Sequence, residues 1–353
     1  MTHQFVFQMV KQLLKSGSNT KSLHFAMKLV IKFLFINSII CSILLGQNNA
    51  QVQSRIEGTD RTQNNINNQI GGTPDSSGDE AASSDTGAQR PVSLTDDEIS
   101  AFFGYDSKYF YRSNPLFVNG DLGEETKSDM WTNTFFSGVS SVIEGDNSAY
   151  TPFLTTSYTV NDYLEDDLSI FNYNTTSVST GVFSYYGGRN TYFARVIYNM
   201  DRSTENDTED FSEFFTEVGL ITSFQIVDSL GLNSTFGVGK HSSTIDSASG
   251  SRPEDLMDNL ELSATNVFSF GNSFLDDLGL TYRISYQSYE NGTYSDREDF
   301  SHSFYGKYGF TVFDAEQPNL FIFSSYSLRN SNENTFDYDN VDAGIGINLT
   351  ANF

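Results

Sequence analysis

The segment Ala343-Gly-Ile-Gly-Ile-Asn-Leu-Thr-Ala-Asn-Phe353 decides the fold of this chain. Apolar side chains occupy every second position, namely Ala343, Ile345, Ile347, Leu349, Ala351 and Phe353. The residues between them are small or polar. Because side chains alternate across a β-strand, one face of this segment is apolar and the other is polar. A tilted strand of this length can cross a membrane.

The same alternation recurs upstream, within residues 192–198, 214–224, 230–238, 260–270 and 278–286. Such faces suit lipid on one side and water or packed polar groups on the other. The charged residues of these strands fall on the face that avoids lipid: Arg195, Glu217, Glu261, Arg283 and Lys307. A charge on the lipid face would cost roughly 2–4 kcal/mol at the bilayer centre.

The C-terminal pattern resembles the closing strand of bacterial outer-membrane β-barrel proteins. The residues that carry this resemblance are Ile345, Ile347, Leu349, Ala351 and the terminal Phe353. The resemblance is to the porin-like class in general and singles out no particular family. It implies an outer-membrane location, contact with outer-membrane lipids, and recognition of the terminal strand by the barrel-assembly machinery.

From about Tyr105 onward the pattern predicts an all-β, antiparallel up-and-down transmembrane barrel of about twelve strands, spanning residues 105–353. The first strand is expected at about 107–118. Short connections are expected near 144–149, 187–190, 226–229, 271–277 and 314–318. Long ones are expected near 119–130, 161–174, 200–212, 241–257, 289–299 and 330–339. A secreted sandwich or β-helix is the alternative, but sandwich strands average about five or six residues.

Aromatic residues make up 14% of the chain, a loading that fits two girdles at the membrane surfaces. Near the short turns, the girdle candidates are Tyr192, Phe224, Phe270 and Phe310. Near the long loops, they are Tyr198, Phe214, Tyr286, Phe304 and Tyr326.

The N-terminal part predicts targeting and linking segments. Residues 1–50 form a secretory signal region with Met27 as an alternative start, Phe33–Gly46 as the apolar run and cleavage after Ala50. Residues 51–104 are predicted to form a disordered periplasmic linker, because few apolar residues offset its ordering entropy. A short helix is expected near 96–103, after the capping box formed by Thr95 and Glu98.

The charge and motif content excludes several functional classes. The net charge is −25, and the first 50 residues contain five Lys but no acid, so an acidic surface argues against nucleic acid. The single cysteine, Cys41, lies in the signal region. No nucleotide loop or zinc spacing occurs. We therefore predict no enzymatic role, no catalytic residues, no metal and no cofactor. Calcium binding by Asp337–Asp342 is a weaker alternative, because the segment lacks the glycine turn of an EF-hand.

The barrel interior carries the functional hypothesis. The candidate pore-lining residues are Arg195, Glu217, Glu261, Arg283, Lys307 and Arg329. We predict a narrow pore whose acid-rich mouth favours cations, or a structural surface barrel. One alternative is a surface adhesin that uses long acidic extracellular loops. A minor alternative is a rim hydrolase, since His241-Ser242-Ser243 resembles the His-x-Ser of outer-membrane phospholipase A. The oligomeric state stays open.

Overall fold

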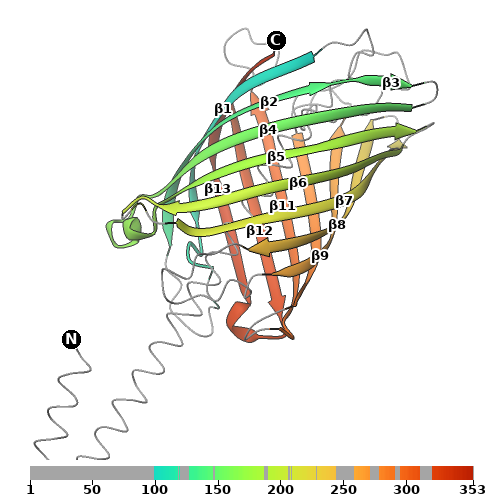
Figure 1. Ribbon diagram of the computed structural model, residues 1–353. Coiled ribbons are helices and arrows are strands. Elements are labelled where there is room, and N and C mark those ends of the chain that lie inside the picture. The colour runs from blue at the N-terminus through green and yellow to red at the C-terminus, as the bar shows by residue number, and fades with distance from the viewer. Residues whose placement is uncertain are drawn as a thin grey trace, which may run out of the picture. The chain divides into compact units, whose positions relative to one another are not determined.

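The computed structural model describes residues 99–117, 119, 127–145, 148–186, 190–205, 207, 209–227, 229–243, 258–270, 278–290, 295–310 and 320–352. The predicted signal region, linker residues 51–98 and Phe353 lie outside these ranges. The strands, shown in Figure 1, are β1 (Ile99–Arg112), β2 (Ser128–Ser141), β3 (Ile143–Gly145), β4 (Ser148–Tyr163), β5 (Tyr173–Tyr186), β6 (Asn190–Ser203), β7 (Glu209–Val227), β8 (Leu230–Ser243), β9 (Asn259–Phe270), β10 (Leu278–Tyr289), β11 (Glu298–Phe310), β12 (Leu320–Ser331) and β13 (Tyr338–Asn352). Two short 3-10 helices, η1 (Asp166–Phe171) and η5 (Asn334–Phe336), lie in the connections.

The strands close into an antiparallel barrel. From β4 to β13 each strand pairs with the next, β13 pairs with β1, β1 with β2, and β2 with β4. The short β3 follows β2 after one residue and pairs with the start of β4, so it extends β2. The described strands therefore occupy twelve positions around the barrel, which confirms the predicted fold class and strand number.

The start of the barrel differs from the prediction. β1 begins at Ile99 and ends at Arg112, so residues 99–103 are strand rather than helix, and the strand is not at 107–118. From Phe102 to Arg112 every residue has a partner on both β2 and β13. These two ladders satisfy the backbone donors and acceptors along the segment, and they outweigh a single local capping box.

The strand connections differ in length between the two ends of the barrel. At one end β2/β3 and β4, β5 and β6, and β7 and β8 are joined across 146–147, 187–189 and 228–229. At the other end the connections include 113–127, 164–172 and 244–258. The predicted alternation is not strict, because the connection 311–319 at the first end is longer than 204–208 and 332–337 at the second. We call these the short-turn end and the long-loop end. Phe102 pairs with Asn352, so the barrel begins and finishes at the short-turn end.

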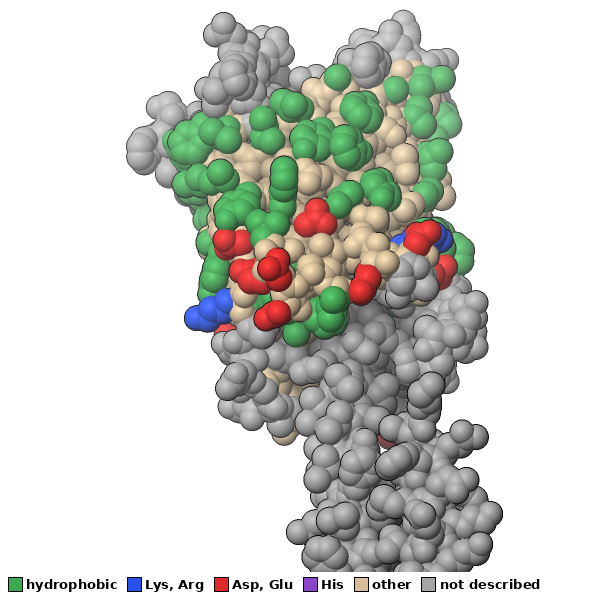
Figure 2. All heavy atoms as spheres, turned by 90° about the vertical axis from the view of Figure 1, so that its left-hand side faces the viewer, with side chains coloured by type: hydrophobic (Ala, Val, Ile, Leu, Met, Phe, Trp, Pro, Cys, Tyr) green, Lys and Arg blue, Asp and Glu red, His purple; other side chains and the backbone are tan. Residues whose placement is uncertain are grey.

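The outer face of the barrel is apolar, as the alternation predicted. Val218, Ile345 and Tyr192 are 57%, 53% and 50% exposed, while their strand neighbours point inward. Figure 2 shows apolar side chains over the upper part of one face and acidic side chains in a band below them. An exposed apolar surface of this extent is unusual for a protein in water. It is the surface expected against acyl chains.

The girdle candidates lie on this outer face. Those more than one-third exposed are Tyr192, Phe214, Phe224, Phe304, Phe310 and Tyr326. The half-buried Tyr198 contacts the Phe214 ring, with centroids 5.0 Å apart, and Tyr286 and Phe270 are also half-buried. In the terminal strand Ile345, Leu349 and Ala351 are exposed and Ile347 is half-buried. Their roles in membrane anchoring and assembly stay predictions.

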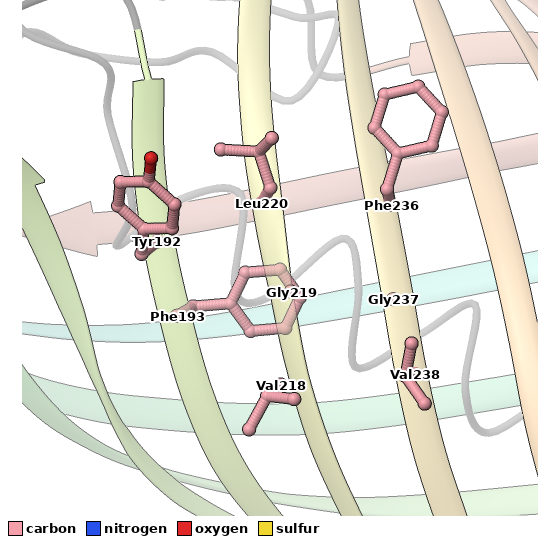
Figure 3. Close-up of a pocket in the computed structure, with 8 residues that line it drawn as sticks. All are labelled: Tyr192, Phe193, Val218, Gly219, Leu220, Phe236, Gly237 and Val238. Carbon is pink, nitrogen blue, oxygen red and sulfur yellow. The ribbon is translucent and has the colours of Figure 1, made fainter.

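The inner face carries aromatic packing that the sequence analysis did not predict. Phe102, Phe136, Phe153, Phe183, Tyr185, Phe193 and Ile221 form one buried cluster, which we call the inner aromatic cluster. Several of these rings lie flat against a glycine of the neighbouring strand. Phe136 is paired with Gly104, where a Cβ would overlap the ring. Phe193 lies beside Gly219 in the same way, as Figure 3 shows. Rings therefore occupy interior space along β1–β7.

Candidate functional site

The charged interior of the barrel is the candidate site, and it contains all six predicted pore-lining residues. Arg195 lies on β6, Glu217 on β7 and Glu261 on β9. Arg283 lies on β10, Lys307 on β11 and Arg329 on β12. Because side chains alternate along each strand and the apolar set faces outward, these six residues belong to the inward-facing set. That they line a path for solutes stays a prediction.

Arg195 and Glu217 form a buried pair directly across β6 and β7. The Arg195 Nε donates to a Glu217 carboxylate oxygen at 2.6 Å, and the side chains are only 8% and 5% exposed. Two glycines make the room for this pair. A Cβ at Gly181 would overlap Arg195, and one at Gly237 would overlap the Glu217 carboxylate.

A second network centres on His241, which lies between two carboxylates. Its Nδ1 is 2.8 Å from Glu213 Oε2, and its Nε2 is 3.6 Å from Glu261 Oε2. The imidazole stacks on the Phe215 ring with centroids 4.1 Å apart. Arg283 donates to the other oxygen of Glu261. The network therefore ties β7, β8, β9 and β10 together inside the barrel.

The structure corrects the expected place of His241. The sequence analysis put it at the start of a long loop, but it lies in β8 and is 1% exposed. The imidazole can be buried because the Phe215 ring packs against it and because a carboxylate lies beside each of its two nitrogens. The resemblance to outer-membrane phospholipase A requires a histidine on the outer face of the barrel. His241 faces inward, so the arrangement that motivated the rim hydrolase is not present here.

A third network closes around Arg297 and Arg329 near the long-loop end. Arg297 donates to Asp299, with its Nε 2.9 Å from Oδ1, and its guanidinium lies 3.4 Å from the centre of the Phe336 ring. Arg329 Nε lies 3.6 Å from Asp299 Oδ2. These three charged side chains are no more than 1% exposed. Neither Arg297 nor Asp299 was predicted as an interior residue, because both fall in the expected long connection 289–299.

Other interior charges keep access to solvent. The Lys108 side chain is 26% exposed and its ion-pair partner Asp106, 2.9 Å away, is 15% exposed. Arg283 is 17% exposed, and Lys307 is half-buried with its Nζ 5.6 Å from the Phe321 ring centre. Asp106 and Arg283 lie near the middle of β1 and β10. The interior is thus closed along part of its wall, whereas the charged side chains in the middle of β1 and β10 keep some exposure to solvent.

Two classes of site are absent from the part of the chain that the structure describes. No helix there is long and apolar enough to cross a membrane. Among the same residues, no group of His, Cys, Asp and Glu side chains is arranged to hold a metal ion.

Comparisons with known proteins agree in general architecture only. No protein-family description matches the sequence, and no curated protein matches it. Solved structures that resemble the chain include Pseudomonas aeruginosa OpdQ, with 11% identity, a TM-score of 0.34, and coverage of 72% of this chain and 98% of that one. Acinetobacter baumannii OccAB3 has 11% identity and a TM-score of 0.34, covering 72% and 100%. The β domain of the Bordetella autotransporter Brka has 10% identity and a TM-score of 0.33, covering 71% and 99%.

Likeness at this level carries no argument about function. The assignment rests instead on the closed ladder of strands and on the apolar exterior, which together are the features of membrane-spanning β-barrels. The molecule is a closed antiparallel β-barrel of twelve strand positions with the exterior of a membrane-spanning protein.

Proposed function

We propose that the protein is a narrow solute pore of the bacterial outer membrane. The observation that supports this most directly is the exposure of Asp106, Lys108 and Arg283 inside the barrel. These residues lie at the same depth as outer-face residues that we expect to contact lipid. A charged side chain at membrane depth requires water or a partner, because its burial in hydrocarbon is costly. Since these three groups have partners and keep contact with solvent, we infer that water enters the interior.

The pore is narrow because other side chains fill much of the barrel. A barrel of this strand number is wider than the eight-stranded kind, whose interior side chains fill. Here the inner aromatic cluster occupies the side formed by β1–β7, and the Arg297–Asp299–Arg329 network occupies part of the long-loop end. The space left for water therefore lies off-centre, beside the partly exposed side chains of Asp106, Lys108 and Arg283.

The orientation follows from the two ends of the barrel. Short turns on the periplasmic side and long loops outside are the arrangement that outer-membrane barrels adopt. β1 begins at the short-turn end, which supports our proposal that the predicted linker is periplasmic. Exposed acids then lie at the outer mouth, among them Asp166 and Asp167 of η1 and Asp207, which is 82% exposed. Their field favours cations at the mouth, as predicted from the sequence.

Conductance of the refolded full-length chain in planar bilayers tests the proposal. A pore gives discrete current steps. Thr281→Trp should lower the step size, since Thr281 faces inward two residues from Arg283. Leu280→Trp is the matched control, because Leu280 is 38% exposed on the outer face and the same ring there leaves the path open. A folded barrel that gives no current would instead be a structural surface barrel.

A further inference from the structure

We propose that the lumen selects anionic solutes, because in each of its solvent-exposed ion pairs the basic side chain is more exposed than its acidic partner. This inference rests on the proposed pore, and it names the class of solute. It opposes the cation preference predicted from the acidic mouth.

Four interior ion pairs have a side chain at least 8% exposed, and in each of them the basic side chain is the more exposed: Lys108 26% and Asp106 15%, Arg112 16% and Asp342 7%, Arg195 8% and Glu217 5%, Arg283 17% and Glu261 3%. In the fully buried pairs Arg329–Asp299 and His241–Glu261 the two exposures are nearly equal. The difference is largest for Arg283 and Glu261. A solute in the water-filled part of the lumen therefore meets more guanidinium and ammonium surface than carboxylate surface.

The hydrogen bonds explain why the acids are hidden. Glu261 accepts from Arg283 and, at 3.2 Å, from Gln287, so its oxygens are held at the wall. Asp342 accepts from Arg112 Nε at 2.9 Å, from one terminal Arg112 nitrogen at 3.0 Å, and from Asn340 at 2.8 Å. A carboxylate has no donor of its own when ionised, and these partners use the directions in which it would bind a cation.

The basic groups are spread along the depth of the barrel. Arg112 ends β1 at the long-loop end, Arg283 lies in the middle of β10, and Lys307 lies near the short-turn end of β11. Lys307 approaches the Phe321 ring, which covers Gly346, and Gly346 pairs with Lys108. Lys108 and Lys307 therefore flank the same ring. An anion passing along this wall meets basic groups at successive depths.

The acidic mouth is too far away to cancel this field. Arg283 is six residues from Tyr289 at the end of β10, a distance of about 20 Å at ~3.3 Å per residue. The Debye length is about 10 Å at 0.1 M salt. Exposed mouth acids such as Asp207 are therefore largely screened at the depth of Arg283. The charges of the inner wall lie close to a passing solute, so they determine the ion selectivity at the depth of Arg283.

Reversal potentials across a KCl gradient test the inference on the same refolded chain. The wild type should prefer chloride at 0.1 M salt and above. Lys307→Gln should lower the chloride-to-potassium permeability ratio about twofold, because one cation leaves the lumen wall. Lys108→Gln should do the same, and the double variant should lower the ratio further. Lys240→Gln is the matched control, since Lys240 faces outward and pairs with Glu290.

The outcomes separate the two proposals. Current steps with a cation preference in the wild type overturn the anion inference and leave the pore standing. A chloride preference that neither lumen lysine changes overturns the assignment to these side chains. A folded barrel without current overturns the pore, and the anion inference falls with it. Arg283→Gln is unsuitable as the main variant, because it removes the charged partner of buried Glu261.

Discussion

The buried pair of Arg195 and Glu217 gives the sharpest prediction about stability. Replacing Arg195 with Met leaves the Glu217 carboxylate 5% exposed, without its ionic partner and next to the apolar packing of the inner wall. Breaking a buried pair from one side typically costs about 3–5 kcal/mol, since the remaining charge is not solvated. Arg195 also lies 5.4 Å from the Phe193 ring centre, a contact worth a further ~0.5–1 kcal/mol.

The double variant Arg195→Met/Glu217→Leu should recover most of that loss, because two apolar side chains of similar volume often replace a buried pair at little net cost. The assay is urea unfolding of the barrel in phospholipid vesicles, followed by tryptophan fluorescence and gel mobility. The outward pair Lys240–Glu290, with side chains 48% and 41% exposed, is the control, and Lys240→Met should cost under about 1 kcal/mol. An equally small cost for Arg195→Met, or no recovery in the double variant, would refute this account of the interior.

Three further predictions concern packing, the lipid face and assembly. Gly104→Val should cost about 1–3 kcal/mol, since its side chain would overlap the Phe136 ring, whereas Gly306→Ala, which meets only a flexible Leu280 methyl at 3.3 Å, should cost far less in the same urea titration. Val218→Arg places a charge on the lipid face and should lower stability by roughly 2–4 kcal/mol in vesicles; an unchanged midpoint would argue against lipid at this face. Deletion of Phe353 should reduce the folded barrel recovered from cells while leaving refolding in detergent intact, and equal recovery from cells would contradict its role as an assembly signal.

The outer face of the barrel was predictable because a single pattern, an apolar residue at every second position of a strand, determines it. Lipid accepts only apolar side chains, so every second residue of a strand is constrained regardless of its neighbours. For the same reason Arg195, Glu217 and Lys307 were placed on the inner face from the sequence alone. Which acid meets which base was not predictable, since Glu261 reaches both His241 and Arg283 through a register that joins three strands.

The aromatic interior was missed because alternation describes only one face. In Phe102-Phe103 the first ring is 9% exposed and the second 52%, and in Phe214-Phe215 the order is reversed, at 45% and 2%. Such doublets send one ring to lipid and one inward. The glycine opposite some inner rings, such as Gly104 opposite Phe136 and Gly219 opposite Phe193, is the remaining signal, but it becomes visible only once the register is known. His241 was missed because the polar sequence around it shows no apolar alternation.

The seam between β1 and β13 has a consequence for biogenesis. It joins residues such as Arg112 and Asp342, which are 230 positions apart in the chain and share two hydrogen bonds. A ladder between strands so far apart in the sequence forms late, because β1 and β13 can pair only after the whole segment between them has reached the membrane. Until that moment two long strand edges are open to foreign strands. We therefore expect the nascent polypeptide to depend on chaperones during transit, more than its stability once closed would indicate.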